Sequence, residues 1–318
     1  MRPRGPSTTV RTTVRTTAAR AGAVRAGAVL AGLLLLSACG RATAGAAPDP
    51  APSSAPSPPS ASSPPATAAA LPRPAHTVVV VMENHGFDDV VDSPKAPWLN
   101  GLPAAVLTDW HGVAHPSQPN YLGLFTGSTH GVTDDHCPVR VPGPTLGSQL
   151  QTAGATFTGY SEGLPAAGST VCRVGDYARK HNPWVDSTRL PAAVNQPLTA
   201  LPTDFAALPT VAFVIPDLCH DTHDCHTVEG DRWLRDTLGP YVAWARTHDS
   251  LLVVTYDEQE GHGASNHIPT FLVGPMVAPG RYAVRGDHYT MLRTLEALNG
   301  LPGIGAAADR EPLTQIWR

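Results

Sequence analysis

"TVVVVMEN", residues 77–84, is an almost unbroken run of β-branched residues that ends in a glutamate and an asparagine. Such a run is typical of a parallel β-strand that is covered on both faces. Three further stretches have a similar composition: "TVAFVIP" (210–216), "SLLVVTY" (250–256) and "IPTFLVG" (268–274). Helical patterns occur at 145–154, 230–248 and 289–300. The alternation predicts an α/β fold, a three-layer α/β/α sandwich with a mostly parallel central sheet.

Polar residues follow three of these strands where each strand ends. They are Glu83 and Asn84, then Asp217, then Asp257 and Glu258. Ligands of open α/β sheets bind beyond the carboxyl ends of the strands, so these side chains are candidates for one site. Oxygen ligands of this kind suit Ca²⁺, Mg²⁺ or Mn²⁺, and mixed use with zinc or iron stays open. The pattern therefore favours a divalent metal ion without identifying it.

A serine between two prolines stands out in "HPSQPNYLGLFTG", residues 115–127. Asn120 is a good N-cap for the apolar run that follows it, and Gly127 is a natural helix stop. Ser117 is then expected just ahead of a helix N-terminus, where free N–H groups and the helix dipole favour an anion. The alternative is a capping serine in a turn.

A second serine competes for the role of nucleophile. "GYSEG" (159–163) matches the G-x-S-x-G elbow of α/β-hydrolases, in which a helix begins directly after the serine. Here Gly163, Pro165 and Gly168 follow too closely for a helix to form. We therefore reject this serine as the nucleophile.

Histidines are the candidates for proton transfer, and the chain has 14. His223 lies a few residues after the strand at 210–216, between Cys219 and Cys225. This position predicts an imidazole at the same edge of the sheet as the carboxylates.

The N-terminus predicts an exported protein. Residues 1–38 contain six arginines followed by a short apolar stretch, which is typical of a signal peptide and too short to span a membrane. The sequence "LSAC" (36–39) resembles a bacterial lipobox, which implies cleavage before Cys39 and lipid attachment to its sulfur. Two acyl chains would give a stable membrane anchor. Secretion without a lipid is the alternative.

The lipidated N-terminus and a linker rich in Pro, Ala and Ser occupy residues 39–74, which have no apolar face to bury. The remaining residues, 75–318, suit one α/β domain. Loss of the leader leaves 16 basic and 26 acidic residues, a net charge of −10. So acidic a domain is a poor nucleic-acid binder, and we expect no nucleic-acid partner.

Four cysteines remain after Cys39 is assigned to lipid, and an exported protein favours disulfides. Local spacing favours Cys137–Cys172 and Cys219–Cys225 over the crossed pairings. A thiolate–histidine metal site in "CHDTHDCH" (219–226) is the alternative, and export argues against free thiolates.

Together these residues resemble the bacterial phosphoesterase family that contains acid phosphatases and phospholipases C, within the alkaline-phosphatase-like superfamily. The resemblance runs through the whole domain in order. It is carried by "VVVVMENH" (78–85), "HPSQPNYLGLFTG" (115–127), "ARKHNPWV" (178–185), "PDLCHDTHDC" (216–225), "VTYDEQEG" (254–261) and "NHIPT" (266–270).

The resemblance implies a role for each matching residue. Ser117 corresponds to the nucleophile that takes up the phosphoryl group, and His223 to the active-site histidine. Asn120 would contact a phosphate oxygen, and Lys180 with His181 lies in a segment that reaches the phosphate. The implied metal ligands are Glu83, Asn84, Asp257 and Glu258. No complete second set of ligands is present, so one divalent ion is expected.

The implied activity is that of a phosphoric ester hydrolase, an acid phosphatase acting through a phosphoserine. Its substrate would be a small phosphate ester or a phosphoinositide-like molecule. A phospholipase C-type phosphodiesterase on the same fold is the first alternative. A non-catalytic solute-binding lipoprotein is the second, although such a protein would not need carboxylates at its strand ends. The oligomeric state stays open.

Overall fold

The computed structural model describes residues 71–261 and 265–318. The predicted signal peptide, the lipid attachment at Cys39 and all of the predicted linker except 71–74 lie outside these residues.

The strands are β1 (His76–Met82), β2 (Ala105–His111), β3 (Phe157–Ser161), β4 (Arg173–Val174), β5 (Tyr177–Ala178), β6 (Asn195–Pro197), β7 (Val211–Ile215), β8 (Ser250–Tyr256), β9 (Thr270–Val273) and β10 (Gly280–Asp287). The α-helices are α1 (Phe87–Val90), α2 (Pro97–Asn100), α3 (Ser117–Thr126), α4 (Leu146–Thr152), α5 (Pro183–Asp186), α6 (Thr227–Ala245) and α7 (His288–Leu298). Short 3₁₀ turns occupy Arg179–His181, Ala192–Val194, Leu198–Ala200, Phe205–Ala207 and Gly305–Asp309.

Eight strands form one sheet in the order β10-β2-β9-β8-β1-β7-β3-β6. β1 lies between β7 and β8 and pairs with both in parallel. β9 runs antiparallel to β8 and to β2, and the other pairs are parallel. The predicted fold class, with a mostly parallel sheet, is confirmed. The three central strands therefore deliver their carboxyl ends to one edge of the sheet.

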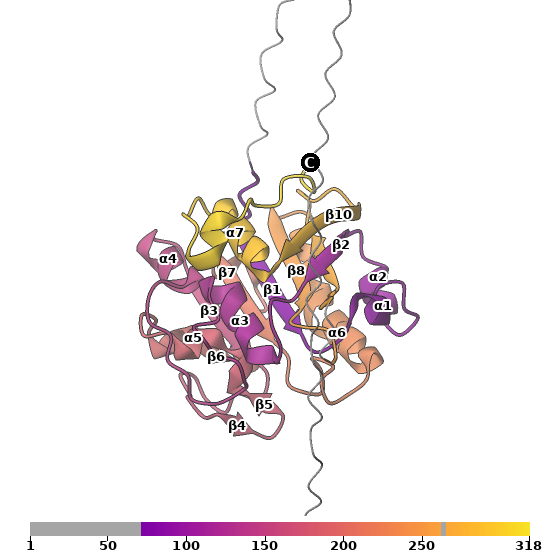
Figure 1. Cartoon of the computed structure of the whole chain (residues 1–318). Coiled ribbons are helices and arrows are strands. Elements are labelled where there is room, and N and C mark those ends of the chain that lie inside the picture. The colour runs from indigo at the N-terminus through magenta and orange to yellow at the C-terminus, as the bar shows by residue number, and fades with distance from the viewer. Residues whose placement is uncertain (1–70, 262–264) are drawn as a thin grey trace, which may run out of the picture. The chain divides into compact units, whose positions relative to one another are not determined.

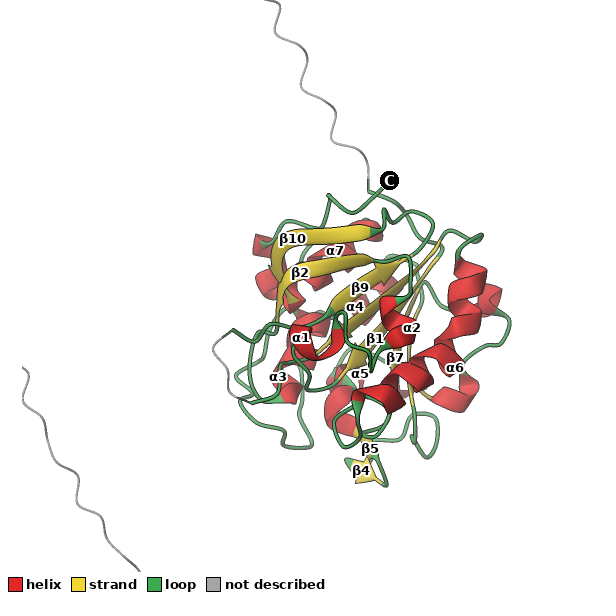
Figure 2. Cartoon of the chain, turned by 90° about the vertical axis from the view of Figure 1, so that its right-hand side faces the viewer, coloured by secondary structure: helices red, strands yellow, loops and turns green. Residues whose placement is uncertain are grey.

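Helices cover both faces of this sheet. Helices α3, α4, α5 and α7 lie on one face, and α1, α2 and α6 lie on the other, as Figures 1 and 2 show from two directions. β1, β7 and β8 are buried almost throughout, as strands covered on both sides must be. Among the described residues, no helix has the length and apolar character needed to cross a bilayer.

Helix α3 begins earlier than the sequence predicts. Pro116 is its N-cap and Ser117 is its first residue, so Asn120 lies inside the helix and the predicted Asn120 cap is wrong. Pro119 is the third residue of this helix and does not prevent the earlier start. Proline is tolerated in the first turn of a helix, because the N–H groups there have no intrahelical partner. Ser117 thus belongs to the helix N-terminus itself.

Both predicted disulfides are present, Cys137–Cys172 and Cys219–Cys225. The alternative of a thiolate–histidine metal site at residues 219–226 is therefore excluded. Its two cysteines, Cys219 and Cys225, form a disulfide and have no free thiolate.

The C-terminus of α3 depends on Gly127. This residue has φ +70°, and its carbonyl accepts a hydrogen bond from Ala306 N at 2.8 Å. A Cβ at this position would lie 2.2 Å from the carbonyl oxygen of Ile304, whereas one at Gly154, with φ +78°, would meet nothing within 4 Å. The two glycines therefore share the same backbone conformation in different surroundings.

We predict that Gly127→Ala destabilises the protein far more than Gly154→Ala. Both variants carry the cost of a left-handed alanine, about 1 kcal/mol. Gly127→Ala adds a backbone clash, so the total should reach about 3 kcal/mol or more. Urea unfolding measures both free energies. Equal losses would show that residues 304–306 do not pack on α3 as described.

Candidate active site

Ser117 lies at the junction of the two central strand ends. Its side chain is buried, with 2% of the residue exposed. The hydroxyl oxygen lies 2.8 Å from Glu83 Oε2 and 3.2 Å from Glu258 Oε1. The backbone N–H of Asp257 donates to the carbonyl of Met82, so the chain after β8 stays paired with the end of β1. Two neighbouring strand ends therefore present carboxylates to one serine.

Three buried carboxylates surround this serine: Glu83, Asp257 and Glu258. Asp257 Oδ1 accepts a hydrogen bond from the Asn84 N–H at 3.0 Å. Burial, and then the charges of Glu83 and Glu258, raise the pKa of Asp257 well above its usual range. Burial also raises the pKa of Glu258, although contact with His115 Nδ1 opposes that shift. These like charges repel one another, and a cation among them would relieve the repulsion.

The chemistry of these residues suits a divalent metal ion, although the group of described residues whose ligand atoms lie within 4.8 Å of one another is Glu162, Asp217 and His220. Asp257 Oδ2 is buried and accepts no hydrogen bond, and the buried Glu83 Oε1 has His181 Nε2 at 3.1 Å without the geometry of a hydrogen bond. Buried polar atoms are normally paired, so two orphaned carboxylate oxygens in one cluster need an explanation. Carboxylates are the ligands that hard divalent cations prefer. The roles of Glu83, Asn84, Asp257 and Glu258 as ligands stay predictions, and the chemistry of the cluster supports them.

His181 is buried and lies against Glu83. Its Nε2 is 3.1 Å from Glu83 Oε1, and its Nδ1 is 3.5 Å from Asp221 Oδ2. The ring stacks on Tyr121 with centroids 4.8 Å apart. Burial lowers the pKa of His181 to about 4, so the ring is neutral near pH 7. The structure places the His181 ring against Glu83, and the predicted reach of the segment of Lys180 and His181 to the phosphate stays a prediction.

The loop between Cys219 and Cys225 holds the end of β1. The Asp221 carbonyl accepts from the Glu83 N–H at 2.8 Å, and the Thr222 hydroxyl donates to the Glu83 carbonyl at 2.9 Å. Thr222 has φ +83°, a conformation that β-branched residues rarely adopt. The disulfide-closed loop therefore keeps a strained residue in place against both backbone groups of Glu83.

Lys180 connects Ser117 to a cavity of about 320 Å³. Its Nζ lies 3.4 Å from Ser117 Oγ and 2.8 Å from Asp135 Oδ2. Burial alone would lower the pKa of Lys180, but the charges of Glu83 and Asp135 outweigh it and raise that pKa. We call this space the Lys180 cavity. Among the residues that line it are Asp135, Arg173, Lys180, His223 and Asp224.

His223 lines the Lys180 cavity. Its N–H donates to Asp221 Oδ1 at 2.8 Å, and its Nδ1 lies 2.6 Å from Asp224 Oδ1. Contact with Asp224 through Nδ1 leaves Nε2 for a substrate atom. The arrangement is compatible with proton transfer by His223, which stays a prediction.

Asn120 has a different role from the predicted one. Its Oδ1 accepts from the N–H groups of Val113 and Ala114, and its Nδ2 donates to the carbonyls of Ala114 and Pro116. These four hydrogen bonds use the full capacity of the amide. Asn120 therefore holds the loop before Ser117 and has no donor left for a phosphate oxygen, which corrects that prediction.

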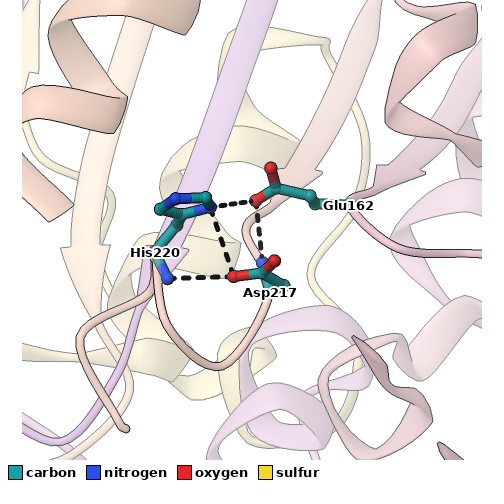
Figure 3. Close-up of side chains that lie close together, drawn as sticks. All are labelled: Glu162, Asp217 and His220. Carbon is teal, nitrogen blue, oxygen red and sulfur yellow. Dashed lines mark hydrogen bonds and ion pairs between the residues drawn. The ribbon is translucent and has the colours of Figure 1, made fainter. Parts of the chain in front are cut away.

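A second cluster lies at the ends of β3 and β7. One ligand atom each of Glu162, Asp217 and His220 lies within 4.8 Å of the others, so the group could hold a metal ion (Figure 3). Within the cluster, His220 Nδ1 is 2.9 Å from Glu162 Oε2, and the backbone N–H groups of Asp217 and His220 are also bonded to its carboxylates. These hydrogen bonds already pair the polar groups of the cluster, so it is also compatible with a turn that binds no ion.

Sequence reasoning missed three residues of the site: Asp135, Asp221 and His115 in its contact with Glu258. Asp221 lies in the loop at 216–225, in which only His223 was predicted to be a site residue. Asp135 is an ordinary loop aspartate in the sequence, and only the fold brings it to Lys180.

Comparison of the sequence with known proteins identifies its family. Residues 98–302 match the Phosphoesterase family. The chain is 46% identical over 255 residues to a phosphatidylinositol-3-phosphatase of Mycobacterium tuberculosis, covering 79% of this chain and 85% of the relative. It is 30% identical over 250 residues to an acid phosphatase of Aspergillus fumigatus, covering 71% of this chain and 55% of that relative. The match thus spans about half the length of the fungal protein.

Solved structures share the fold. One is a protein in the alkaline phosphatase superfamily from Vibrio parahaemolyticus, with a TM-score of 0.51 at 15% identity, covering 77% of this chain and 71% of that one. Another is a 2-O GAG sulfatase, with a TM-score of 0.52 at 12% identity, covering 77% and 76%. At such identities the likeness concerns the fold alone. On the sequence matches, the chain belongs to the Phosphoesterase family.

Proposed function

We propose that this protein is a phosphatase that hydrolyses phosphate monoesters through a covalent phosphoserine at Ser117. The observation that carries the proposal is the position of the Ser117 hydroxyl, between the carboxylates of Glu83 and Glu258 and within 3.4 Å of the Lys180 ammonium. Family membership and the names of the relatives support the same reaction class.

The first half of the reaction transfers the phosphoryl group to Ser117. The serine oxygen attacks phosphorus, and its proton passes to Glu83 Oε2, which lies 2.8 Å away. The bond from phosphorus to the alcohol oxygen breaks, and His223 gives that oxygen a proton. Lys180 and the backbone N–H of Ser117 stabilise the negative charge on the phosphoryl oxygens, because Pro119 has no N–H and the Gln118 N–H donates to Asp135 Oδ1 at 3.0 Å.

The second half releases phosphate. Water attacks the phosphoserine and gives a proton to His223, while the proton on Glu83 returns to the serine oxygen. The products are the alcohol and inorganic phosphate, and every group regains its starting state. A divalent ion held by Glu83, Asn84, Asp257 and Glu258 would supply positive charge for the phosphoryl oxygens.

We also propose that the protein works outside the cytoplasm, on a lipid anchor at Cys39. The leader at 1–38, the lipobox resemblance and the linker support this placement. The two disulfides fit an oxidising compartment.

Removal of the nucleophile tests the mechanism. Ser117→Ala should lower turnover of para-nitrophenyl phosphate by about a thousandfold or more, because the attacking atom is gone. Quenched reactions with ³²P-labelled substrate should trap label on the wild type and none on the variant.

Ser161→Ala is the matched control, since Ser161 is the serine of the rejected G-x-S-x-G stretch and is also buried. It should retain activity and label. Substantial turnover by Ser117→Ala would refute the phosphoserine, and a higher rate on a bis-nitrophenyl diester would favour the phosphodiesterase instead.

A second pair of variants locates the metal. Asp257→Asn removes a negative charge with little change of shape, so it should weaken metal binding and lower activity, and added metal should partly restore it. Asp217→Asn makes the same change in the Glu162–Asp217–His220 cluster and should leave both unchanged. Elemental analysis and calorimetric titration with Mn²⁺ measure binding without relying on activity. If Asp217→Asn lost the metal and Asp257→Asn kept it, the ion would belong to the Glu162–Asp217–His220 cluster.

A further inference from the structure

The charges around the Lys180 cavity are unequally paired. Asp135 holds Lys180 at 2.8 Å, and Asp224 holds His223 at 2.6 Å. Arg173 also lines the cavity, and within residues 71–261 and 265–318 it forms no ion pair; its side chain donates to the Gly175 carbonyl at 3.4 Å. The cavity wall therefore carries a positive charge that no carboxylate of the described chain neutralises.

Arg173 and Lys180 belong to one short structural unit. Arg173 lies in β4 and pairs with Ala178 of β5, two residues before Lys180. The preceding residue, Cys172, is bonded to Cys137, and its carbonyl accepts from the Arg179 N–H at 3.0 Å. The disulfide and the hairpin therefore fix Arg173 relative to Lys180, whose Nζ marks the position of the reacting phosphoryl group beside Ser117.

We propose that Arg173 binds a second anionic group on the alcohol part of the substrate. The preferred substrates are then phosphomonoesters whose alcohol carries a further phosphate or phosphodiester. The planar guanidinium binds such groups through two parallel hydrogen bonds. The proposal rests on the proposed function, because it assumes that the Lys180 cavity receives the leaving alcohol.

A lipid headgroup and a soluble metabolite could both supply this chemistry. Val171 and Val174 flank Arg173 and are unusually exposed for valine, at 37% and 44%. Exposed apolar side chains beside a free arginine would favour contact with an anionic lipid surface. The two sources can therefore be separated by changing the valines and the arginine independently.

The kinetic test compares glycerol phosphate, whose leaving group is uncharged, with glycerol bisphosphate, whose leaving group carries a phosphate. Arg173→Ala should raise KM for the bisphosphate about tenfold and change kcat and the KM for glycerol phosphate by less than about twofold. Arg173→Lys should raise the KM for the bisphosphate less, because lysine keeps the positive charge but lacks the planar guanidinium that forms two parallel hydrogen bonds. Arg189→Ala, which removes an exposed arginine at a different cavity, should change neither substrate. Equal effects of Arg173→Ala on both substrates would overturn the proposal.

A binding test separates this inference from the reaction. In the Ser117→Ala background, calorimetry should show about tenfold weaker binding of glycerol bisphosphate when Arg173→Ala is added, and an unchanged affinity for glycerol phosphate. Unchanged affinity for the bisphosphate would overturn the role of Arg173 even in an active phosphatase. Conversely, the absence of turnover with any ester would refute the proposed function and leave this binding result to stand by itself.

Two forms of phosphatidylinositol 3-phosphate test whether the anionic group belongs to a membrane lipid or to a soluble molecule. The short-chain lipid in solution and the long-chain lipid in phosphatidylcholine vesicles present the same headgroup. If the substrate is a lipid, Val171→Ser with Val174→Ser should lower the rate on vesicles severalfold and spare the soluble form. If the double valine variant changes the rate on neither form while Arg173→Ala lowers it on both, Arg173 recognises the anionic group of a soluble alcohol.

Discussion

Repulsion among Glu83, Asp257 and Glu258 is the constraint around which the site is built. Two unit charges about 4 Å apart interact by about 4 kcal/mol at an effective dielectric of about 20, so three buried carboxylates cannot stay ionised without compensation. Lys180 provides one positive charge, and a divalent ion would provide the rest. In the proposed reaction the same repulsion is useful, since a bound phosphate would bring negative charge and would need the cations that these carboxylates would hold.

The two disulfides stabilise different parts of this arrangement. Cys219–Cys225 closes the loop that holds both backbone groups of Glu83 and contributes Asp221 to His181. Cys137–Cys172 joins the segment that carries Asp135 to the hairpin that leads to Lys180. Both bonds therefore position charged groups around Ser117, which explains why a domain with a large buried sheet also uses covalent links outside that sheet.

The sequence allowed the central strands to be predicted because their signal is local. β1, β7 and β8 are continuous apolar runs, and the residues that follow them are placed by the strand ends alone. β2 and β10 were not predicted, since each is partly exposed and mixes polar with apolar residues. The role of His181 depends on contacts with the distant residues Glu83 and Asp221, whereas Asn120 bonds to the loop just before its own helix. The positions of His181 and Asn120 could be predicted from the motif, but their hydrogen-bond partners could not.

The contrast between Ser117 and Ser161 shows which features make a serine a candidate nucleophile. Both are buried, and both lie at the end of a secondary structure element. Ser161 ends β3 inside a familiar short motif, yet its hydroxyl has no hydrogen-bond partner in the described chain and no helix follows it. Ser117 begins a ten-residue helix and faces two carboxylates and an ammonium. Groups that could take the proton and bind the phosphoryl oxygens therefore distinguish the two serines, whereas the local motif alone would have selected Ser161.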